Sequence, residues 1–337
     1  MSVSGLPFDD IRELMAQLPP PDETAGRIAR ERAMAISEAF SCVDESDAGT
    51  SEWLARWSGK SPKVSRPVLA LFAGTHKVCE HYGMDADEAV PGEPALSIVT
   101  RLAAGGSPAN QVCASADIGL KAFDLALQYP VEDITSAEAM DEKGSAATVG
   151  FGMEAVAGGV DILGLAAFGQ GSEIASAAIL TILLGGEPGD WLVMPAGSSD
   201  RARNAALAAA SKAVSLHGAA RGNPLELLRR VGGREFSAMA GAMLSARTQH
   251  VPVVTGGMTA LAVQCLLEAQ QVGAGEHCRH VLHPSDRVSA TAAAAGGVDT
   301  IASTFTDYVD GADVAAAIAQ IRLASEVHSG TVISHDS

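Results

Sequence analysis

A glycine-rich corner between residues 160 and 178 is the part of the sequence best suited to hold a ligand. An apolar run over residues 160–165 leads into Phe168-Gly169-Gln170-Gly171-Ser172-Glu173, and an alanine-rich helical run follows. A buried strand that ends in a flexible loop at the start of a helix can bind an anion, because backbone N–H groups and the positive end of the helix converge there. The corner predicts a small-molecule pocket with Gly169 and Gly171 in its wall.

Three further loops of this kind occur along the chain. They are Gly74-Thr75-His76-Lys77, Pro195-Ala196-Gly197-Ser198-Ser199-Asp200 and Thr255-Gly256-Gly257. Glycines also end strands simply to turn the chain, so one loop alone says little. In a parallel sheet, however, all these loops would meet at the carboxyl edge, and together they predict one ligand crevice.

A metal site is the alternative to consider at the histidines His277, His280 and His283, which recur every three residues beside Cys278. Imidazoles at this spacing can share part of a helical face and bind a metal ion. Because the segment has the pattern of a strand, His280 should point away from the other two. We therefore expect no metal site and no cofactor.

Composition narrows the class of protein. The chain has 337 residues, 47% of them hydrophobic, and a formal net charge of −17, which repels nucleic acid and anionic membranes. Its apolar stretches are too short to cross a bilayer, and the first residues lack a basic segment followed by an apolar one. Five scattered cysteines favour neither disulfides nor a thiolate metal site. We expect a cytoplasmic protein with a small-molecule ligand.

Short β-rich runs alternate with helical ones, which predicts an α/β fold with a doubly wound, mostly parallel sheet. The expected strands are residues 68–72, 119–125, 160–165, 251–254 and 280–282, and residues 8–18, 25–40 and 312–326 should be helices. Residues 41–51 have the composition of a solvated loop. We expect the two chain ends, residues 1–66 plus about 305–337, to form a small helical subdomain beside a large α/β domain of residues 67–304.

Several stretches carry a resemblance to a known family. They are Gly5-Leu6-Pro7-Phe8-Asp9-Asp10, Phe151-Gly152-Met153-Glu154-Ala155-Val156-Ala157-Gly158-Gly159, Gly232-Gly233-Arg234-Glu235 and Met239-Ala240-Gly241-Ala242-Met243-Leu244. Spread over nearly the whole chain, they resemble the nicotinate-nucleotide:5,6-dimethylbenzimidazole phosphoribosyltransferases of cobalamin lower-ligand assembly. The resemblance implies a parallel sheet, a helical domain built from both chain ends, and a homodimer with its pocket at the carboxyl edge.

The activity that the resemblance implies is a transfer of ribose phosphate from nicotinate mononucleotide to 5,6-dimethylbenzimidazole, which gives α-ribazole phosphate and nicotinate. A carboxylate should accept the benzimidazole N–H proton. In the family this base is the Glu of a Gly-Glu-Gly-Ser/Thr-Gly turn, which matches Val309-Asp310-Gly311-Ala312-Asp313 here. Asp310 is therefore the candidate base, with Gly311 beside it. Alternatively, Asp310 merely caps the helix that follows.

Other matched positions depart from the family pattern. The family's Glu and Asn in the glycine-rich corner fall at Ala167 and Ser172, and its benzimidazole-side Gln falls at Ser97. We expect Glu173 to point away from the pocket because it opens the helix. The family's Asp/Asn-His-Gly appears as Thr75-His76-Lys77, which keeps the imidazole, and its Asp-Gly after the fourth strand appears as Gly256-Gly257. The loop over residues 79–90 is longer and more acidic, and the amino-terminal Lys-Pro-Pro-Gly-x-Leu-Gly segment is absent.

The loop that would hold the phosphate keeps Gly197 and Ser198, whose backbone N–H groups lie before a predicted helix. Asp200 would repel a phosphate if it faced inward, and Asn204 stands where a Lys is usual. Arg201 and Arg203 could compensate for that loss, or could be surface charges.

Three hypotheses for function remain. The first is an active phosphoribosyltransferase with Asp310 as base. The second is a weakened or inactive relative that binds a nucleotide or a benzimidazole-like ligand, as a homodimer or as the non-catalytic partner of an active homologue. The third is a nicotinamide-cofactor oxidoreductase, which lacks the expected Gly-x-Gly-x-x-Gly after the first strand. The replacements at positions 97, 167 and 172 favour the second.

Overall fold

A six-stranded, all-parallel sheet forms the centre of the protein, with strand order β2-β1-β3-β4-β5-β6. The computed structural model describes residues 5–40, 45–83, 93–303 and 310–329. The strands are β1 (Pro67–Ala73), β2 (Gly119–Asp124), β3 (Ile162–Phe168), β4 (Val253–Thr255), β5 (Cys278–Leu282) and β6 (Thr300–Ala302).

Five of these strands lie where the sequence predicts them, and β6 was missed. Only three residues long, β6 is too short to carry a readable period, and it is defined by its pairing with β5. The predicted α/β fold with a doubly wound parallel sheet is confirmed.

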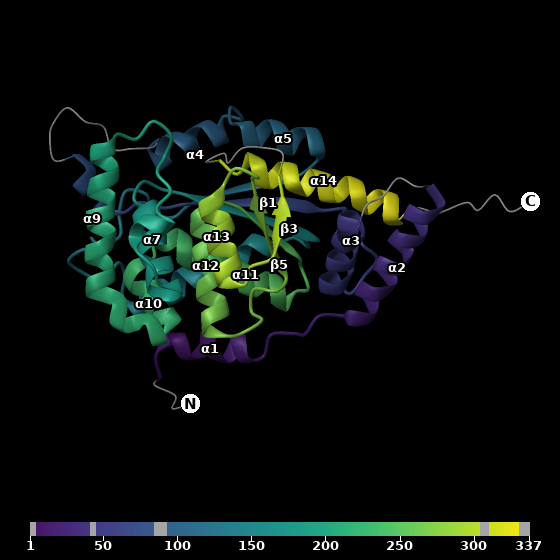
Figure 1. Cartoon of the computed structure of the whole chain (residues 1–337), viewed down its shortest axis with the longest axis horizontal. Helices are drawn as coiled ribbons and strands as arrows, with labels where there is room; N and C mark the ends of the chain where they lie inside the picture. Colours follow the sequence, from purple (N-terminus) through teal and green to yellow (C-terminus); the bar gives the residue numbers. More distant parts are fainter. Residues whose placement is uncertain (1–4, 41–44, 84–92, 304–309, 330–337) are drawn as a thin grey trace, which may run out of the picture.

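Helices connect and cover the strands (Figure 1). They are α1 (Pro7–Ala16), α2 (Glu23–Phe40), α3 (Glu45–Ser58), α4 (Ala95–Ala103), α5 (Pro108–Ala116), α6 (Glu142–Gly152), α7 (Ser172–Leu184), α8 (Pro188–Trp191), α9 (Asp200–His217), α10 (Pro224–Val231), α11 (Arg234–Thr248), α12 (Gly257–Gln270), α13 (Arg287–Gly296) and α14 (Ala312–Ser329). Short 3-10 helices span Lys77–Gly83, Met153–Val156 and Gly218–Gly222. None of the helices in the described ranges is long and apolar enough to span a membrane.

The two faces of the sheet pack against different helices. Along β1, Leu69 and Leu71 belong to a core shared with α3, α4, α5 and α14, whereas Ala70 and Phe72 belong to a core shared with α6, α7, α11 and α12. Alternate residues of a strand point to opposite faces, so both faces of a buried strand must be apolar. This two-sided burial explains the nearly continuous apolar sequence of β1 and β3.

At one end of the molecule α2 and α3 pack together, and α14 extends from the sheet to contact both (Figure 1). The inner part of α14 also packs on the sheet, where Val314 and Ile318 are fully buried. Helix α1 instead contacts α6. The division into a helical subdomain and a large domain stays a prediction.

The predicted loop over residues 41–51 was wrong for residues 45–51, which begin α3, while residues 41–44 lie outside the described ranges. Trp53, Leu54 and Trp57 repeat at helical spacing and are buried, which gives α3 its inner face. In the middle of α3, Ser51 is fully buried, with its hydroxyl 2.5 Å from His328 Nδ1 of α14. The polar composition of the segment concealed this contact between the two chain ends.

The three regularly spaced histidines lie at β5 and do not share one site. His277 Nε2 donates to the Met243 carbonyl at 2.9 Å, His280 Nδ1 lies 3.0 Å from the Thr255 hydroxyl, and His283 Nδ1 lies 2.7 Å from the Ser285 hydroxyl. Within the described ranges no group of three or more His, Cys, Asp or Glu side chains could hold a metal ion. Burial lowers the pKa of His277 to about 3 and that of His280 to about 4.

These two histidines make folding stability depend on pH. A depressed folded-state pKa means that the unfolded chain binds more protons, so stability is full above about pH 6.5 and falls as the pH drops toward the folded pKa. We predict a loss of about 1.4 kcal/mol per pH unit for each histidine when urea unfolding is measured between about pH 6.5 and 5. His277→Gln, which can still donate to Met243, should lower the slope by about 1.4 kcal/mol per pH unit. An unchanged slope would contradict the account.

Candidate functional site

The candidate pocket lies where β1 and β3 run side by side and the chain connections leave in opposite directions. Phe72 pairs with Ala167 and Ala73 with Phe168. In open α/β sheets such a switch point at the carboxyl edge is where ligands bind. A cavity of about 370 Å³ opens there, between the β3 corner, the start of α12, residues 193–196 and Asp313 of α14. This volume is typical of small-molecule sites.

Four of the predicted site residues line this cavity: Ala167, Gly169, Ser172 and Gly256. They come from the glycine-rich corner after β3 and from the loop after β4. The convergence of separate strand ends was therefore predicted correctly for these two loops.

The other predicted residues lie around the cavity without lining it. Gly197 and Ser198 directly follow the lining residues Pro195 and Ala196. Ser97 is exposed on α4, although its neighbour Ile98 lines the cavity. Gly171 is buried beneath the corner. Most of the acidic loop after Lys77, residues 84–92, lies outside the described ranges.

Asp310, the predicted base, is a buried link between two helices and is only 3% exposed. Its Oδ2 accepts the backbone N–H of Ala109 in α5 at 3.0 Å, and its Oδ1 accepts that of Ala312 at the start of α14 at 3.3 Å. The alternative prediction, that Asp310 caps the following helix, is confirmed. Its role as a base stays a prediction. Gly311 packs beside it at φ +76°, where an added Cβ would lie 2.8 Å from Leu71.

Three buried polar side chains meet behind the cavity. His76 Nε2 lies 2.5 Å from Glu235 Oε1, and the Ser172 hydroxyl donates to the same oxygen at 2.7 Å. Both side chains of the His76–Glu235 pair are inaccessible to solvent. Ser172 thus joins this buried cluster to the cavity wall.

The pKa values of both side chains are shifted in the direction that favours the ionised pair. Burial alone would lower the pKa of His76, but the Glu235 carboxylate outweighs burial and raises that pKa above its usual value. Burial would raise the pKa of Glu235, but His76 and the Ser172 hydrogen bond outweigh it and lower that pKa. The buried atoms His76 Nδ1 and Glu235 Oε2 have no hydrogen-bond partner in the described structure.

The pair also explains two of the glycines in the corner loops. An added Cβ at Gly74 would lie 1.9 Å from Glu235 Oε2, and one at Gly171 would lie 2.8 Å from His76 Cβ. Neither position has room for a side chain. Gly74 and Gly171, which lie in two of the predicted ligand loops, therefore leave room for the buried ion pair.

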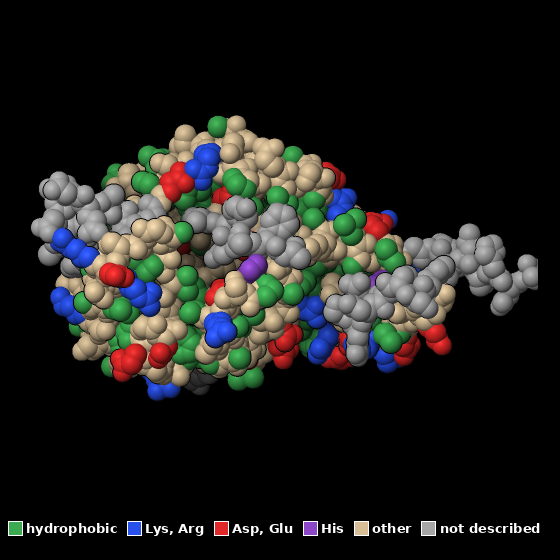
Figure 2. All heavy atoms as spheres, turned by 45° about the horizontal axis from the view of Figure 1, so that its top comes forward, with side chains coloured by type: hydrophobic (Ala, Val, Ile, Leu, Met, Phe, Trp, Pro, Cys, Tyr) green, Lys and Arg blue, Asp and Glu red, His purple; other side chains and the backbone are tan. Residues whose placement is uncertain are grey.

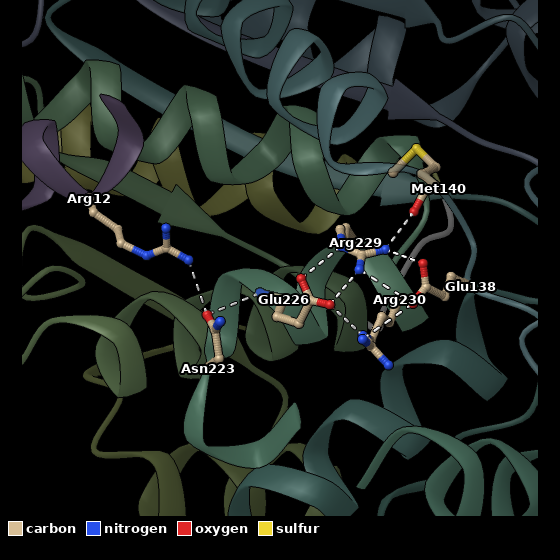
Figure 3. Close-up of polar contacts among 7 residues, drawn as sticks. All are labelled: Arg12, Glu138, Met140, Asn223, Glu226, Arg229 and Arg230. Atoms are coloured by element: carbon tan, nitrogen blue, oxygen red, sulfur yellow. Dashed lines mark hydrogen bonds and ion pairs between the residues drawn. The ribbon is translucent and has the colours of Figure 1, made fainter. Parts of the chain in front are cut away.

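A network of ion pairs and hydrogen bonds holds the loop between β2 and α6 against α10 (Figure 3). Arg229 of α10 binds Glu138 and Glu226, and Arg230 Nε donates to Glu226 at 2.6 Å. These contacts, with the bond from Ala139 N to the Arg230 carbonyl at 2.9 Å, hold residues 138–140 against α10. The same loop contains Val131, which bonds to the backbone of Thr75 and Lys77 on either side of His76.

Sequence reasoning missed or misplaced several lining residues. Glu173 was expected to point away, which was wrong: it lines the cavity, and its Oε2 accepts the Gly171 N–H at 3.0 Å. Gly171, with φ +95°, directly precedes α7. Glu93, Ser176 and Asp313 also line the cavity. Asp313 could have been found, because it follows the candidate base by three residues at a helix start.

Asp313 and Gly256 face each other across the cavity wall. A Cβ added to Gly256 would lie 3.1 Å from Asp313 Oδ2. The family pattern noted above has Asp at position 256 and Gly at position 313, the reverse of this chain. In this chain the carboxylate at this wall comes from the start of α14.

Outside the pocket, the carboxyl-edge side of the molecule has a mixed surface. In Figure 2 Lys and Arg side chains are scattered among Asp and Glu over this face and form no continuous basic area. A second cavity, about 470 Å³, lies between α2, α3 and α12 and is lined by Trp53, Trp57 and several charged side chains. This second cavity is remote from the carboxyl edge and from every predicted site residue. The cavity of about 370 Å³ is therefore the better candidate.

We predict that breaking the buried pair is costly. Glu235→Gln leaves His76 without its charge partner and should lower the free energy of unfolding by about 3–5 kcal/mol, measured by urea denaturation at neutral pH. The exposed pair on the same loop, Lys77 Nζ to Glu132 Oε1 at 2.6 Å, provides the control. Glu132→Gln should cost no more than about 1 kcal/mol. Equal effects of the two variants would contradict the assigned role.

Comparison with known proteins identifies the family. A family model described as phosphoribosyltransferase matches residues 48–337. A Sinorhizobium protein named nicotinate-nucleotide–dimethylbenzimidazole phosphoribosyltransferase is 45% identical over 278 residues, 82% of this chain and 81% of that protein. A Brucella anthropi protein of the same name is 44% identical over 281 residues, with the same two coverages.

The fold agrees with a solved structure. The crystal structure of the Thermus thermophilus enzyme of that name superimposes with a TM-score of 0.76 at 21% identity, over 91% of this chain and 96% of the other. The chain therefore belongs to the nicotinate-nucleotide–dimethylbenzimidazole phosphoribosyltransferase family.

Proposed function

We propose that this protein binds an aromatic nitrogen base in the pocket after β3 and transfers ribose phosphate far more slowly than active relatives. The observation that carries this proposal is the position of Asp310. Both of its carboxylate oxygens accept backbone N–H groups at helix starts, and the side chain is buried. A general base must come within hydrogen-bonding reach of the proton that it accepts, and Asp310 does not line the cavity.

The pocket has apolar walls against which an aromatic ring can pack. Its lining includes the apolar side chains of Ile98, Phe168, Met194 and Met258. Sites for small molecules combine such apolar walls with a few polar groups that fix the orientation of the ligand.

Two family site groups are replaced in the wall. Position 167 carries a methyl group in place of the family's Glu. The Ser172 hydroxyl, in place of the family's Asn, donates back to Glu235. Removal of a single group that stabilises a transition state commonly costs about 10²- to 10³-fold in rate, so we expect these changes together to be severe.

Several hydrogen-bond donors of the predicted phosphate loop already bond to acceptors within the loop. Both the backbone N–H and the hydroxyl of Ser198 donate to the Pro195 carbonyl, at 3.2 and 2.6 Å. At the start of α9 the Ala202 N–H donates to the Ser199 hydroxyl at 3.1 Å. Fewer donors then remain for a phosphate at this helix start.

Oligomeric state and compartment belong to the same proposal. We propose a dimer, with a second copy of this chain or with an active homologue that supplies catalysis. We also propose a cytoplasmic location, which is supported by the free state of the four described cysteines, Cys79, Cys113, Cys265 and Cys278.

The proposal is tested by following nicotinate release from nicotinate mononucleotide and 5,6-dimethylbenzimidazole by chromatography, with the Sinorhizobium relative as positive control. We predict a rate at least about 10³-fold below that of the relative, because several site groups are missing. Asp310→Asn, which keeps an oxygen for one helix cap, should not lower the residual rate further. Binding of 5,6-dimethylbenzimidazole should be measurable by calorimetry.

Turnover within tenfold of the relative that is abolished in folded Asp310→Asn would overturn the catalytic part and establish Asp310 as the base. Failure of the protein to bind the benzimidazole at all would overturn the binding part.

A further inference from the structure

The charge of the pocket is one-sided. Three carboxylate residues line it, Glu93, Glu173 and Asp313, and none of its described lining residues is Lys, Arg or His. Glu93 is balanced at the rim by Arg101, 2.5 Å away. Glu173 and Asp313 lie further in, at the start of α7 and the start of α14.

Both inner carboxylates are fixed in place. Glu173 Oε2 accepts the Gly171 N–H at 3.0 Å, and Asp313, which is only 5% exposed, has its Oδ2 against Gly256. Fixed charges in a partly dehydrated site act more strongly on a ligand than the same charges in water.

A buried hydroxyl provides a second, independent sign of a ligand. Ser176, one turn after Ser172 on α7, lines the same cavity and is 1% exposed. Its Oγ is buried and has no hydrogen-bond partner in the described structure. Since buried hydroxyls are almost always hydrogen-bonded, a ligand N–H or ring nitrogen is the natural partner.

We infer that the pocket binds a positively charged heteroaromatic base more tightly than a neutral or anionic ring of the same shape. This inference rests on the proposed function, because it takes the bound molecule to be an aromatic nitrogen base. The apolar walls at Phe168 and Met258 hold the ring, Asp313 and Glu173 favour its protonated form, and Ser176 bonds to a ring or exocyclic nitrogen.

The test uses three ligands that share one ring and differ in charge at neutral pH. 2-Aminobenzimidazole is the cation, 5,6-dimethylbenzimidazole the neutral base, and benzimidazole-5-carboxylate the anion. We expect calorimetry of the full chain to give the tightest binding for the cation, with dissociation constants rising about tenfold or more at each step to the neutral and anionic rings. Raising the salt concentration should weaken cation binding only slightly, because the charges are partly buried.

Two variants test whether Asp313 causes the preference for the cationic ring. Asp313→Asn, checked for folding by circular dichroism, should remove about tenfold of the advantage of the cation over the neutral ring. Asp117→Asn is the matched control: its carboxylate is 91% exposed at the end of α5, and its backbone, at φ 51°, suits Asn. This control should leave all three dissociation constants unchanged.

Equal or tighter binding of the neutral or anionic ring would overturn the charge selection while leaving the proposed base-binding function in place. Unchanged selectivity in folded Asp313→Asn would show that the Asp313 carboxylate does not cause the charge selectivity. Binding of none of the three rings would overturn the proposed function together with this inference.

Discussion

The carboxyl edge of the sheet is organised around one buried ion pair, His76–Glu235. The two residues are brought together from the end of β1 and the start of α11, 159 positions apart in sequence. Their burial fixes how closely the neighbouring loops approach, since neither Gly74 nor Gly171 has room for a Cβ. Ser172 links this pair to the cavity wall, because it lines the cavity and its hydroxyl donates to Glu235. An uncompensated charge at this depth would be costly, so the pair and its loops must form together.

The location of the pocket was predictable from sequence, whereas its internal chemistry was not. Apolar runs followed by glycine-rich loops marked the ends of β1, β3 and β4, and a parallel sheet brings such ends to one edge. The reason for glycine at positions 74 and 171 was hidden, because it lies in contacts with His76 and Glu235 that no local pattern reveals. The loop predicted over residues 41–51 was wrong at residues 45–51 for a similar reason: Ser51 is polar, yet it is buried against His328 of α14. Tertiary contacts between the chain ends outweighed local composition there.

Family membership and the geometry of the site lead to different expectations for chemistry. Fold and sequence similarity identify the family, but activity depends on the groups placed around the substrate. In this chain the Asp310 carboxylate links α5 to α14, whereas Glu93, Glu173 and Asp313 line the cavity. The pocket therefore has apolar walls and a negative charge, while both carboxylate oxygens of Asp310 accept backbone N–H groups at helix starts.

The central claim, that Asp310 links two helices while the ligand is bound by other groups, is tested most directly by a crystal structure with 5,6-dimethylbenzimidazole bound. The account predicts that the ring lies between Phe168 and Met258, with a ring nitrogen bonded to Ser176 or Asp313. Asp310 should keep its bonds to Ala109 and Ala312. A ring nitrogen within hydrogen-bonding distance of Asp310, with those two backbone bonds broken, would contradict the account.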